Sequence, residues 1–234
     1  MKVLAFDTSS KALSLAILED KQVLAEMTIN IKKNHSITLM PAIDFLMESL
    51  DWTPKDLDRI VVAEGPGSYT GLRIAVATAK TLAHTLNIEL IGMSSLLALV
   101  PYQQEGLFVP LMDARRNNVY ASAYRWENHR LVNILADQHI ALIDLLKQIK
   151  EPAYFVGEAY KFNEQIMSAI PTAEVSEADE LNLPNGIVLG NLGFLAQPVE
   201  NVHGLVPEYL KRVEAEEKWL ENHQPEDENY VEKI

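Results

Sequence analysis

The chain has 234 residues, enough for one large or two small domains, and 48% hydrophobic against 23% charged residues indicates a folded protein with a sizeable core. No apolar run approaches the roughly 20 residues that a bilayer-spanning helix needs, and the N-terminal residues do not have the layout of a signal peptide. Because the chain has no cysteine, disulfides and thiolate metal sites are excluded, and we expect a cytoplasmic protein.

The net charge of −13 is spread unevenly along the chain. Residues 214–234 contain eight carboxylates against two lysines, so this acidic tail carries −6 and the other 213 residues carry −7. We expect the tail to be a solvated helix that frays toward its end. A nucleic-acid-binding protein normally has a basic face, because contacts to phosphates supply much of its affinity. The composition therefore predicts that a partner holds any RNA on which this protein acts.

The first part of the chain reads as an α/β unit. The expected elements are, in order, strands at 2–6, 12–18 and 23–29, a helix at 35–50, a short helix opened by Thr53 and Pro54, a strand at 59–63, a helix at 70–86, a strand at 89–92 and a helix from Ser94. The helix at 35–50 carries two apolar stripes. The helix at 70–86 has apolar or small residues nearly all round.

The pattern starts again near residues 101–106, where we place a domain boundary. The expected elements that follow are strands at 107–113, 119–126 and 131–135, a helix at 140–149, a strand at 153–157 and a helix at 159–169. The two halves open with the same element order, although no residue-level repeat accompanies it. We therefore predict two tandem α/β domains, each with a mixed sheet flanked by helices, at residues 1–102 and 103–213, followed by the tail at 214–234.

A glycine-rich elbow joins the strand at 59–63 to the helix at 70–86. Gly65, Gly67 and Gly71 lie within seven residues of one another there. Glycine allows positive φ and close backbone approach, and the first turn of a helix has unpaired N–H groups. The elbow is thus consistent with an anion or nucleotide site, and equally with a tight strand-to-helix turn that binds no ligand.

Polar residues also end the first strand, at Asp7, Thr8, Ser9 and Ser10, and 113–117 occupies the matching place in the second half. Hydroxyls and a carboxylate at such a hairpin could hold phosphate and magnesium, but they also make ordinary turns, which the residues alone favour. The candidate nucleotide-binding residues are Asp7, Thr8, Ser9, Ser10, Gly65, Gly67 and Ser68.

Three segments together resemble a known family: Leu4-Ala5-Phe6-Asp7-Thr8-Ser9-Ser10, Gly65-Pro66-Gly67-Ser68-Tyr69-Thr70-Gly71-Leu72-Arg73 and Pro207-Glu208-Tyr209-Leu210-Lys211-Arg212. The chain resembles the bacterial TsaB (YeaZ) family of tRNA threonylcarbamoyladenosine biosynthesis proteins over about residues 1–216. The segments 34–36, 92–96 and 112–115 also fall where the pattern of that family expects them. The acidic tail lies outside the resemblance.

The resemblance implies an actin-like, Hsp70-like ATPase fold of the ribonuclease H-like type. It also implies a part in transferring threonylcarbamoyl from threonylcarbamoyl-AMP to N6 of the adenosine beside the tRNA anticodon. In that complex TsaB pairs with its catalytic paralogue TsaD, and the ATPase TsaE joins them. TsaB is regarded as a non-catalytic scaffold or activator, which would reach tRNA only through the complex and would not contact a membrane.

The residues here agree with a non-catalytic role. The paralogue holds a metal with two histidines four residues apart, whereas no two of the six histidines in this chain have that spacing. The segments 113–115 and 156–158 lack the glycines that usually border phosphate and adenosine in this fold. We therefore expect no catalytic residue, no metal ligand and no required cofactor, with at most weak binding of ATP or ADP with magnesium at a degenerate site.

Interaction surfaces are better supported by the sequence. We predict that the helices at 35–50 and 70–86 form a partner interface, which makes a homodimer when the protein is alone and the pair with TsaD when that partner is present. The predicted interface residues are Ile37, Met40, Asp44, Met47, Arg73, Val76, Ala77 and Lys80. The alternative is that both helices are buried wholly within their domain.

Two other functions stay open at this point. An ATP-using phosphotransferase or independent ATPase would use Asp7 to Ser10 and the elbow, and the degenerate second hairpin argues against it. A peptidase acting on TsaD is less favoured, because neither a metal pair nor a cysteine is present and the Ser, His and Asp residues have no recognisable order.

Overall fold

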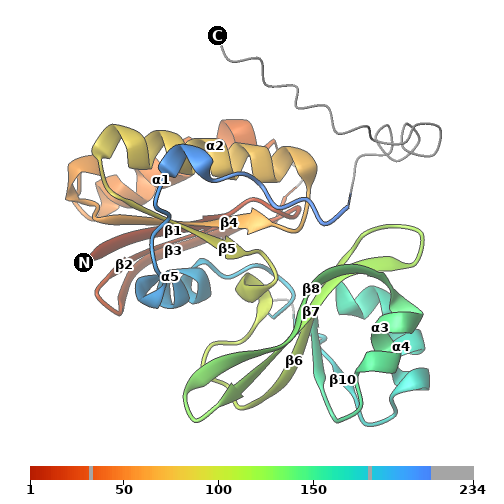
Figure 1. Cartoon of the computed structure of the whole chain (residues 1–234). Coiled ribbons are helices and arrows are strands. Elements are labelled where there is room, and N and C mark those ends of the chain that lie inside the picture. Colours follow the sequence, from red (N-terminus) through yellow and green to blue (C-terminus); the bar gives the residue numbers. More distant parts are fainter. Residues whose placement is uncertain (32–33, 179–180, 212–234) are drawn as a thin grey trace, which may run out of the picture.

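The computed structural model describes residues 1–31, 34–178 and 181–211. Two five-stranded sheets, each flanked by helices, make up this part of the chain (Figure 1). The prediction of two mixed sheets is confirmed. The predicted acidic tail lies outside the described residues.

The first sheet has the strand order β3-β2-β1-β4-β5. Its strands are β1 (Lys2–Asp7), β2 (Leu13–Glu19), β3 (Gln22–Ile29), β4 (Arg59–Gly65) and β5 (Glu89–Ser94). β1 pairs antiparallel with β2 and parallel with β4, and β4 pairs parallel with β5. The unbroken apolar runs of β1, β2 and β4 follow from burial on both faces of the sheet.

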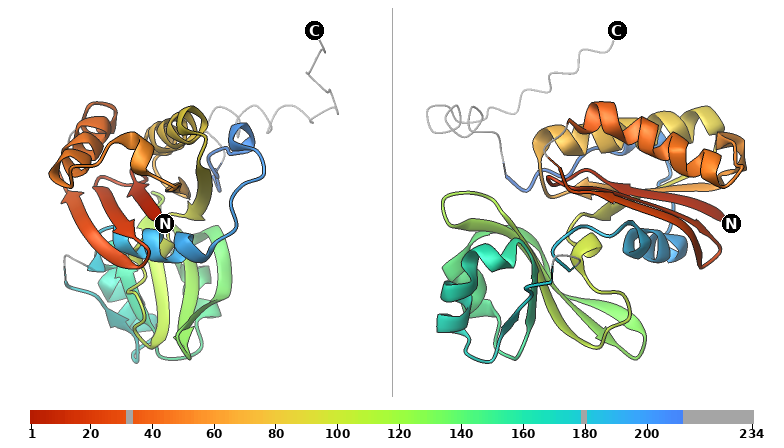
Figure 2. Two further views of the ribbon diagram at one scale, coloured as in Figure 1. Left: turned by 90° about the vertical axis from the view of Figure 1, so that its left-hand side faces the viewer. Right: turned by 180° about the vertical axis from the view of Figure 1, so that it is seen from behind.

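Helices cover both faces of this sheet (Figure 2). α1 (His35–Ser49) and α2 (Tyr69–Leu86) lie on one face and start at the N-caps Asn34 and Ser68, whose side chains accept backbone N–H bonds. α5 (Gly186–Leu195) covers the other face. Alternate residues of β1 point to the two faces. The side chain of Leu4 packs in the core between the sheet and helices α1 and α2. The side chain of Val3 packs on the opposite face, in the core that includes Leu189 of α5.

α5 was not among the helices predicted from the sequence. Its glycines Gly186, Gly190 and Gly193 face the sheet, where a Cβ atom would come within 2.7 Å of Leu15, 2.3 Å of Leu18 and 2.5 Å of Val61. Their spacing of four and three residues puts them on one side of the helix. α5 therefore packs closely on the first sheet, although its residues fall within the range 103–213 that was expected to form the C-terminal domain.

The second sheet has the order β10-β9-β6-β7-β8. Its strands are β6 (Gly106–Asp113), β7 (Asn118–Glu127), β8 (Arg130–Ala141), β9 (Tyr154–Gly157) and β10 (Glu174–Val175), and its helices are α3 (Leu142–Gln148) and α4 (Asn163–Ala169). β6 pairs antiparallel with β7 and parallel with β9, as β1 does with β2 and β4. The shared element order of the two halves is thus confirmed.

Short 3-10 helices occupy several connections: η1 (Pro54–Asp56), η2 (Leu97–Leu99), η3 (Glu158–Phe162) and η5 (Val202–Gly204). The helix expected from Ser94 is replaced by the end of β5 and by η2. The strand expected at 131–135 is longer, because β8 continues to Ala141 beside the whole of β7.

Candidate functional site

The glycine-rich elbow packs against the turn between β1 and β2. Gly67 has φ of 155°, and a Cβ atom there would lie 2.4 Å from the carbonyl oxygen of Ser9. A Cβ atom on Gly71 would lie 2.0 Å from the carbonyl oxygen of Thr8. The backbone N–H of Ser68 donates to the Ser9 carbonyl at 2.6 Å. The structure therefore brings the predicted residues of the elbow and of this turn together, and these glycines make room for the backbone of the chain itself.

The other side of the elbow is covered by residues 199–211, which we call the C-terminal strap. The N–H of Glu208 donates to the carbonyl of Glu64 at 2.7 Å. A Cβ atom on Gly65, whose φ is 144°, would lie 2.2 Å from the Glu208 carbonyl oxygen. The elbow is thus held between the β1–β2 turn and the strap.

Asp7 ends β1 and is completely buried. Its Oδ1 accepts the N–H of Ser9 at 2.5 Å, while neither Oδ2 nor the buried hydroxyl of Ser9 has a partner among the described residues. Burial raises the pKa of Asp7 to about 6, against the opposing effect of the hydrogen bond from the Ser9 backbone N–H. The neighbouring Thr8 is equally buried and donates its hydroxyl to the carbonyl of Gly71 at 2.8 Å.

The matching turn in the second half, between β6 and β7, binds a carboxylate of the chain. Oε2 of Glu158 accepts the N–H of Asp113 at 2.7 Å, and Oδ1 of Asp113 accepts the N–H of Arg115 at 2.8 Å. The ammonium of Lys161 pairs with Glu158 and lies 3.7 Å from Oδ2 of Asp113. A negative charge from η3 therefore already occupies this turn. Glu158 was not among the candidate residues predicted from the sequence.

These contacts test whether the candidate residues fit a nucleotide. Phosphates in proteins are commonly held by free backbone N–H groups. Here the N–H groups of Ser9, Ser68, Asp113 and Arg115 each donate to an oxygen of the chain. These four N–H groups are therefore not free to receive a phosphate, and the close backbone contacts account for the glycines of the elbow.

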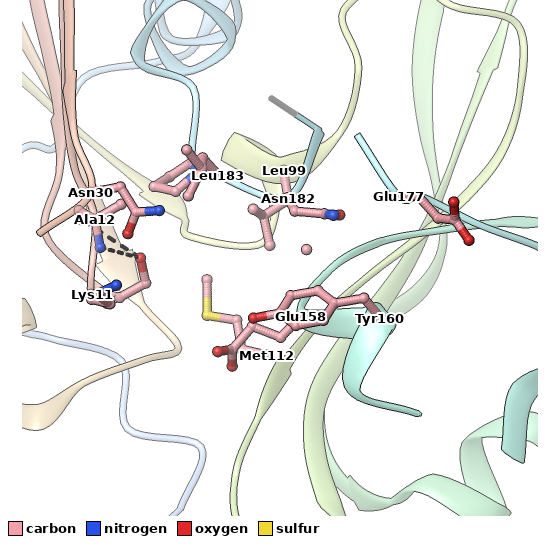
Figure 3. A pocket seen from close by; sticks show the side chains of 13 residues that line it. Lys11, Ala12, Asn30, Leu99, Met112, Glu158, Tyr160, Glu177, Asn182 and Leu183 are labelled. Atoms are coloured by element: carbon pink, nitrogen blue, oxygen red, sulfur yellow. Dashed lines mark hydrogen bonds between the residues drawn. The ribbon is translucent and has the colours of Figure 1, made fainter. Parts of the chain in front are cut away.

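A cavity of about 330 Å³ lies between the two sheets (Figure 3). Ser10 is the one predicted nucleotide-binding residue among its lining residues. The charged side chains around it are those of Lys11, Glu158 and Glu177, so negative charge prevails (Figure 3). The side-chain oxygen of Asn182, also in the lining, is buried and has no partner among the described residues. Such a lining is unfavourable for a polyphosphate.

Within residues 1–31, 34–178 and 181–211, no group of three His, Cys, Asp or Glu side chains could hold a metal ion. In the same part of the chain, the helices are too short or too polar for one of them to span a bilayer.

The outer face of α1 exposes large apolar side chains. The exposed fraction is 68% for Ile37, 46% for Met40 and 58% for Phe45, and Asp44 is exposed between them. Ala77 is exposed on α2, which lies beside α1 on the same face of the sheet (Figures 1 and 2). Phe45 was not among the predicted interface residues; it lies eight residues after Ile37, about 80° around the helix axis from it, on a side of the helix that is also exposed.

Two residues assigned to the partner interface lie in the core instead. Met47 and Val76 are each 3% exposed and pack in the cluster between the helices and the first sheet. Neither side chain is therefore available on the surface for a partner to contact. A charge there would be buried without a partner and would destabilise the fold.

The two predicted cations of α2 hold the C-terminal strap. Nε of Arg73 donates to the hydroxyl of Tyr209 at 3.0 Å, and the guanidinium lies 4.0 Å from the ring centroid of Tyr69. The rings of Tyr69 and Tyr209 stack at 4.5 Å. Nζ of Lys80 donates to two strap carbonyls, those of His203 and Leu205, at 2.8 Å each. This face of α2 is therefore covered by the chain itself.

Two mixed sheets that open with the same order and pairing of strands define a protein of the actin-like ATPase fold. A family model described as TsaD, tRNA N6-adenosine threonylcarbamoyltransferase, matches residues 22–219. The structure of YeaZ from Pseudomonas aeruginosa is similar with a TM-score of 0.75 and 24% identity, over 89% of this chain and 99% of that one.

Sequence relatives point to one branch of this fold. The tRNA threonylcarbamoyladenosine biosynthesis protein TsaB of Bacillus subtilis is 41% identical over 229 residues, which cover 95% of this chain and 99% of that protein. TsaB of Buchnera aphidicola is 29% identical over 68% of this chain and 79% of its own length. The chain belongs to the TsaB family.

Proposed function

We propose that this protein is a non-catalytic scaffold or activator subunit of the complex that transfers threonylcarbamoyl from threonylcarbamoyl-AMP to N6 of the adenosine beside the tRNA anticodon. It pairs with TsaD, and TsaE joins them. It reaches tRNA only through the complex, and forms a homodimer when alone. Family membership supports the pathway, since relatives carry the name of tRNA threonylcarbamoyladenosine biosynthesis.

The observation that carries a docking role is the exposed apolar face of α1. Ile37, Met40 and Phe45 are about half exposed or more, on a helix whose opposite side is fully used in the core. An isolated apolar residue on a surface is ordinary, whereas several on one helix face are typical of an interface. Met adapts readily to the shape of a partner.

The polar turns support the non-catalytic part of the proposal. Four N–H groups of the elbow and of the two turns are bonded within the chain, and two of the three charged side chains that line the cavity between the sheets are carboxylates. Both observations support a role in which the chain contacts a partner protein and does not itself carry out the transfer.

The test is the double substitution Ile37→Glu/Met40→Glu, measured by light scattering after size exclusion and by pull-down with TsaD. Both side chains are exposed, so the fold should remain while homodimer and TsaD pairing are lost. The matched control is Ile143→Glu on α3, whose side chain is 61% exposed in the second half of the protein. The control should pair normally. Unchanged pairing of the double variant would show that the interface lies elsewhere.

A further inference from the structure

A groove of about 540 Å³ lies where the two halves of the protein and the C-terminal strap meet. Its described lining includes Leu97 and Leu192 beside the first sheet, Leu131, Asn133 and Asp137 on β8 of the second sheet, and Glu208 of the strap. The charged side chains in this lining are the carboxylates of Asp137 and Glu208, so we call it the acidic groove. It shares no described lining residue with the cavity of Figure 3 and is therefore a separate site.

Asp137 is bonded to both halves of the protein. Its Oδ1 accepts the hydroxyl of Tyr124 on β7 at 2.8 Å, and its Oδ2 accepts the hydroxyl of Ser94 at the end of β5. Burial, and secondarily the charge of Asp137, raise the pKa of Tyr124, so its hydroxyl stays a donor. A carboxylate has about four lone-pair sites. Asp137 is thus held in place by two donors and can still accept further hydrogen bonds from a ligand.

The negative charge of the groove has no basic partner in the described part of the chain. Asp137 and Glu208 make no ion pair there, and neither does Lys211, three residues further along the strap. Burial, and secondarily the charge of Asp137, raise the pKa of Glu208. Burial, and then the charge of Glu208, raise the pKa of Glu64 to about 7. These carboxylates repel one another, and a cation in the groove would relieve the repulsion.

The rest of the lining indicates what kind of cation fits. In the described residues no group of three His, Cys, Asp or Glu side chains could hold a metal ion, so an organic cation is favoured. Leu97, Leu131 and Leu192 supply apolar surface, on which the methylene groups of a long basic side chain can pack. Arginine suits such a place better than lysine, because its planar guanidinium is weakly hydrated and has five N–H donors.

We propose that the acidic groove receives an arginine side chain of a protein partner. Its guanidinium lies between Asp137 and Glu208, and its methylene groups pack on the leucines. Charge complementarity favours this occupant over nucleic acid, whose phosphates the two carboxylates would repel. The groove is a second docking site, built from other elements than the exposed face of α1.

The first test uses butylguanidinium, which has the chemistry of the arginine side chain, as the probe of the full chain by NMR. We expect saturable shifts of the amides of residues 94, 133 and 137, with a Kd of about 1–10 mM for so small a ligand. Butylurea has nearly the same shape without the charge and should bind about tenfold more weakly. Saturating butylguanidinium should also lower the pKa of Glu64, because a nearby positive charge favours its ionised form.

The test variant is Glu208→Gln, which removes one charge from an exposed residue whose hydrogen bond to Glu64 is made by the backbone. It should weaken the binding of butylguanidinium about fivefold or more. Asp137→Asn keeps an oxygen for the Tyr124 hydroxyl and should weaken the binding at least as much. The matched control is Glu164→Gln, which removes one charge from an exposed position on α4 and should bind the probe as the parent chain does.

The second test is a pull-down with purified TsaD and TsaE, and this part rests on the proposed function. The double variant Asp137→Asn/Glu208→Gln should capture one of the two proteins about tenfold more weakly and should form the homodimer normally. A parent chain that captures neither protein would contradict the proposed function. The groove proposal would be overturned by equal binding of butylurea, by parent-like probe binding of Glu208→Gln, or by parent-like capture of both proteins by the double variant. Loss of the homodimer alone would also overturn it, because a second copy of the chain would then fill the groove.

Discussion

The Glu158 carboxylate accepts the backbone N–H of Asp113 at 2.7 Å, so the start of η3 is bonded to the end of β6. Lys161 pairs with Glu158 from the same 3-10 helix and completes a small charged cluster. A carboxylate of the chain thus takes the place in which this fold could receive an anion.

Glu158→Ala should lower the free energy of unfolding by about 1 kcal/mol, because the Asp113 N–H loses a charged acceptor at a partly exposed position. Glu158→Gln keeps an acceptor oxygen and should lose less. Urea denaturation of the two variants and the parent chain measures both changes. Equal midpoints for all three chains would show that this hydrogen bond does not stabilise the turn.

The close packing of the elbow glycines predicts that a larger residue there lowers stability. Gly71→Ala would place a methyl group 2.0 Å from the Thr8 carbonyl oxygen, so backbone must move, and we expect destabilisation of about 1–3 kcal/mol. Gly204→Ala is the control, since the nearest atom to its Cβ would be 3.8 Å away. That variant should be neutral or slightly more stable, because alanine restricts the unfolded chain. Thermal melting that ranks the two variants in the opposite order would contradict the packing explanation.

The raised pKa of the Glu64 carboxyl group predicts that the free energy of unfolding depends on pH. Burial, and secondarily the charge of Glu208, raise the pKa of Glu64 from 4.5 to about 7. The folded state therefore binds this proton more tightly than the unfolded state. The resulting stabilisation is present below the unfolded pKa of 4.5 and is lost as the pH rises through about 7.

Glu64→Gln cannot lose that proton, so the variant should be more stable than the parent chain at about pH 8, with the difference shrinking toward about pH 5. Subtracting the two stability curves cancels the contribution of Asp7, whose pKa is also raised. A difference that stays constant over this range would mean that Glu64 titrates normally.

Local patterns were sufficient to predict most strands and the two helices on the first sheet. Apolar runs such as those of β1 and β4 have no helical period, and Asn34 and Ser68 are typical N-caps. α5 was missed because its apolar residues surround the helix and three glycines weaken the helical signal. The spacing of Gly186, Gly190 and Gly193 was the available indication of close packing.

The site was harder to predict, because it depends on contacts between distant segments. A turn rich in glycine and hydroxyl groups can bind a phosphate, or it can pack closely against another part of the backbone. The contacts of the elbow with the carbonyls of Ser9 and Glu208 favour close packing, and the sequence alone does not reveal them. Likewise, the apolar pattern of α1 and α2 does not say which stripe faces the sheet. Met47 proved to be in the core, whereas Phe45 proved to be exposed.

The central claim is tested most directly by reconstituting threonylcarbamoyl transfer to tRNA from purified TsaD, TsaE and this protein, with threonylcarbamoyl-AMP supplied. We predict modification only when this chain is present, none from this chain alone, and none when it carries Ile37→Glu/Met40→Glu. Modification at an undiminished rate without the chain, or by the chain alone, would contradict a non-catalytic docking role.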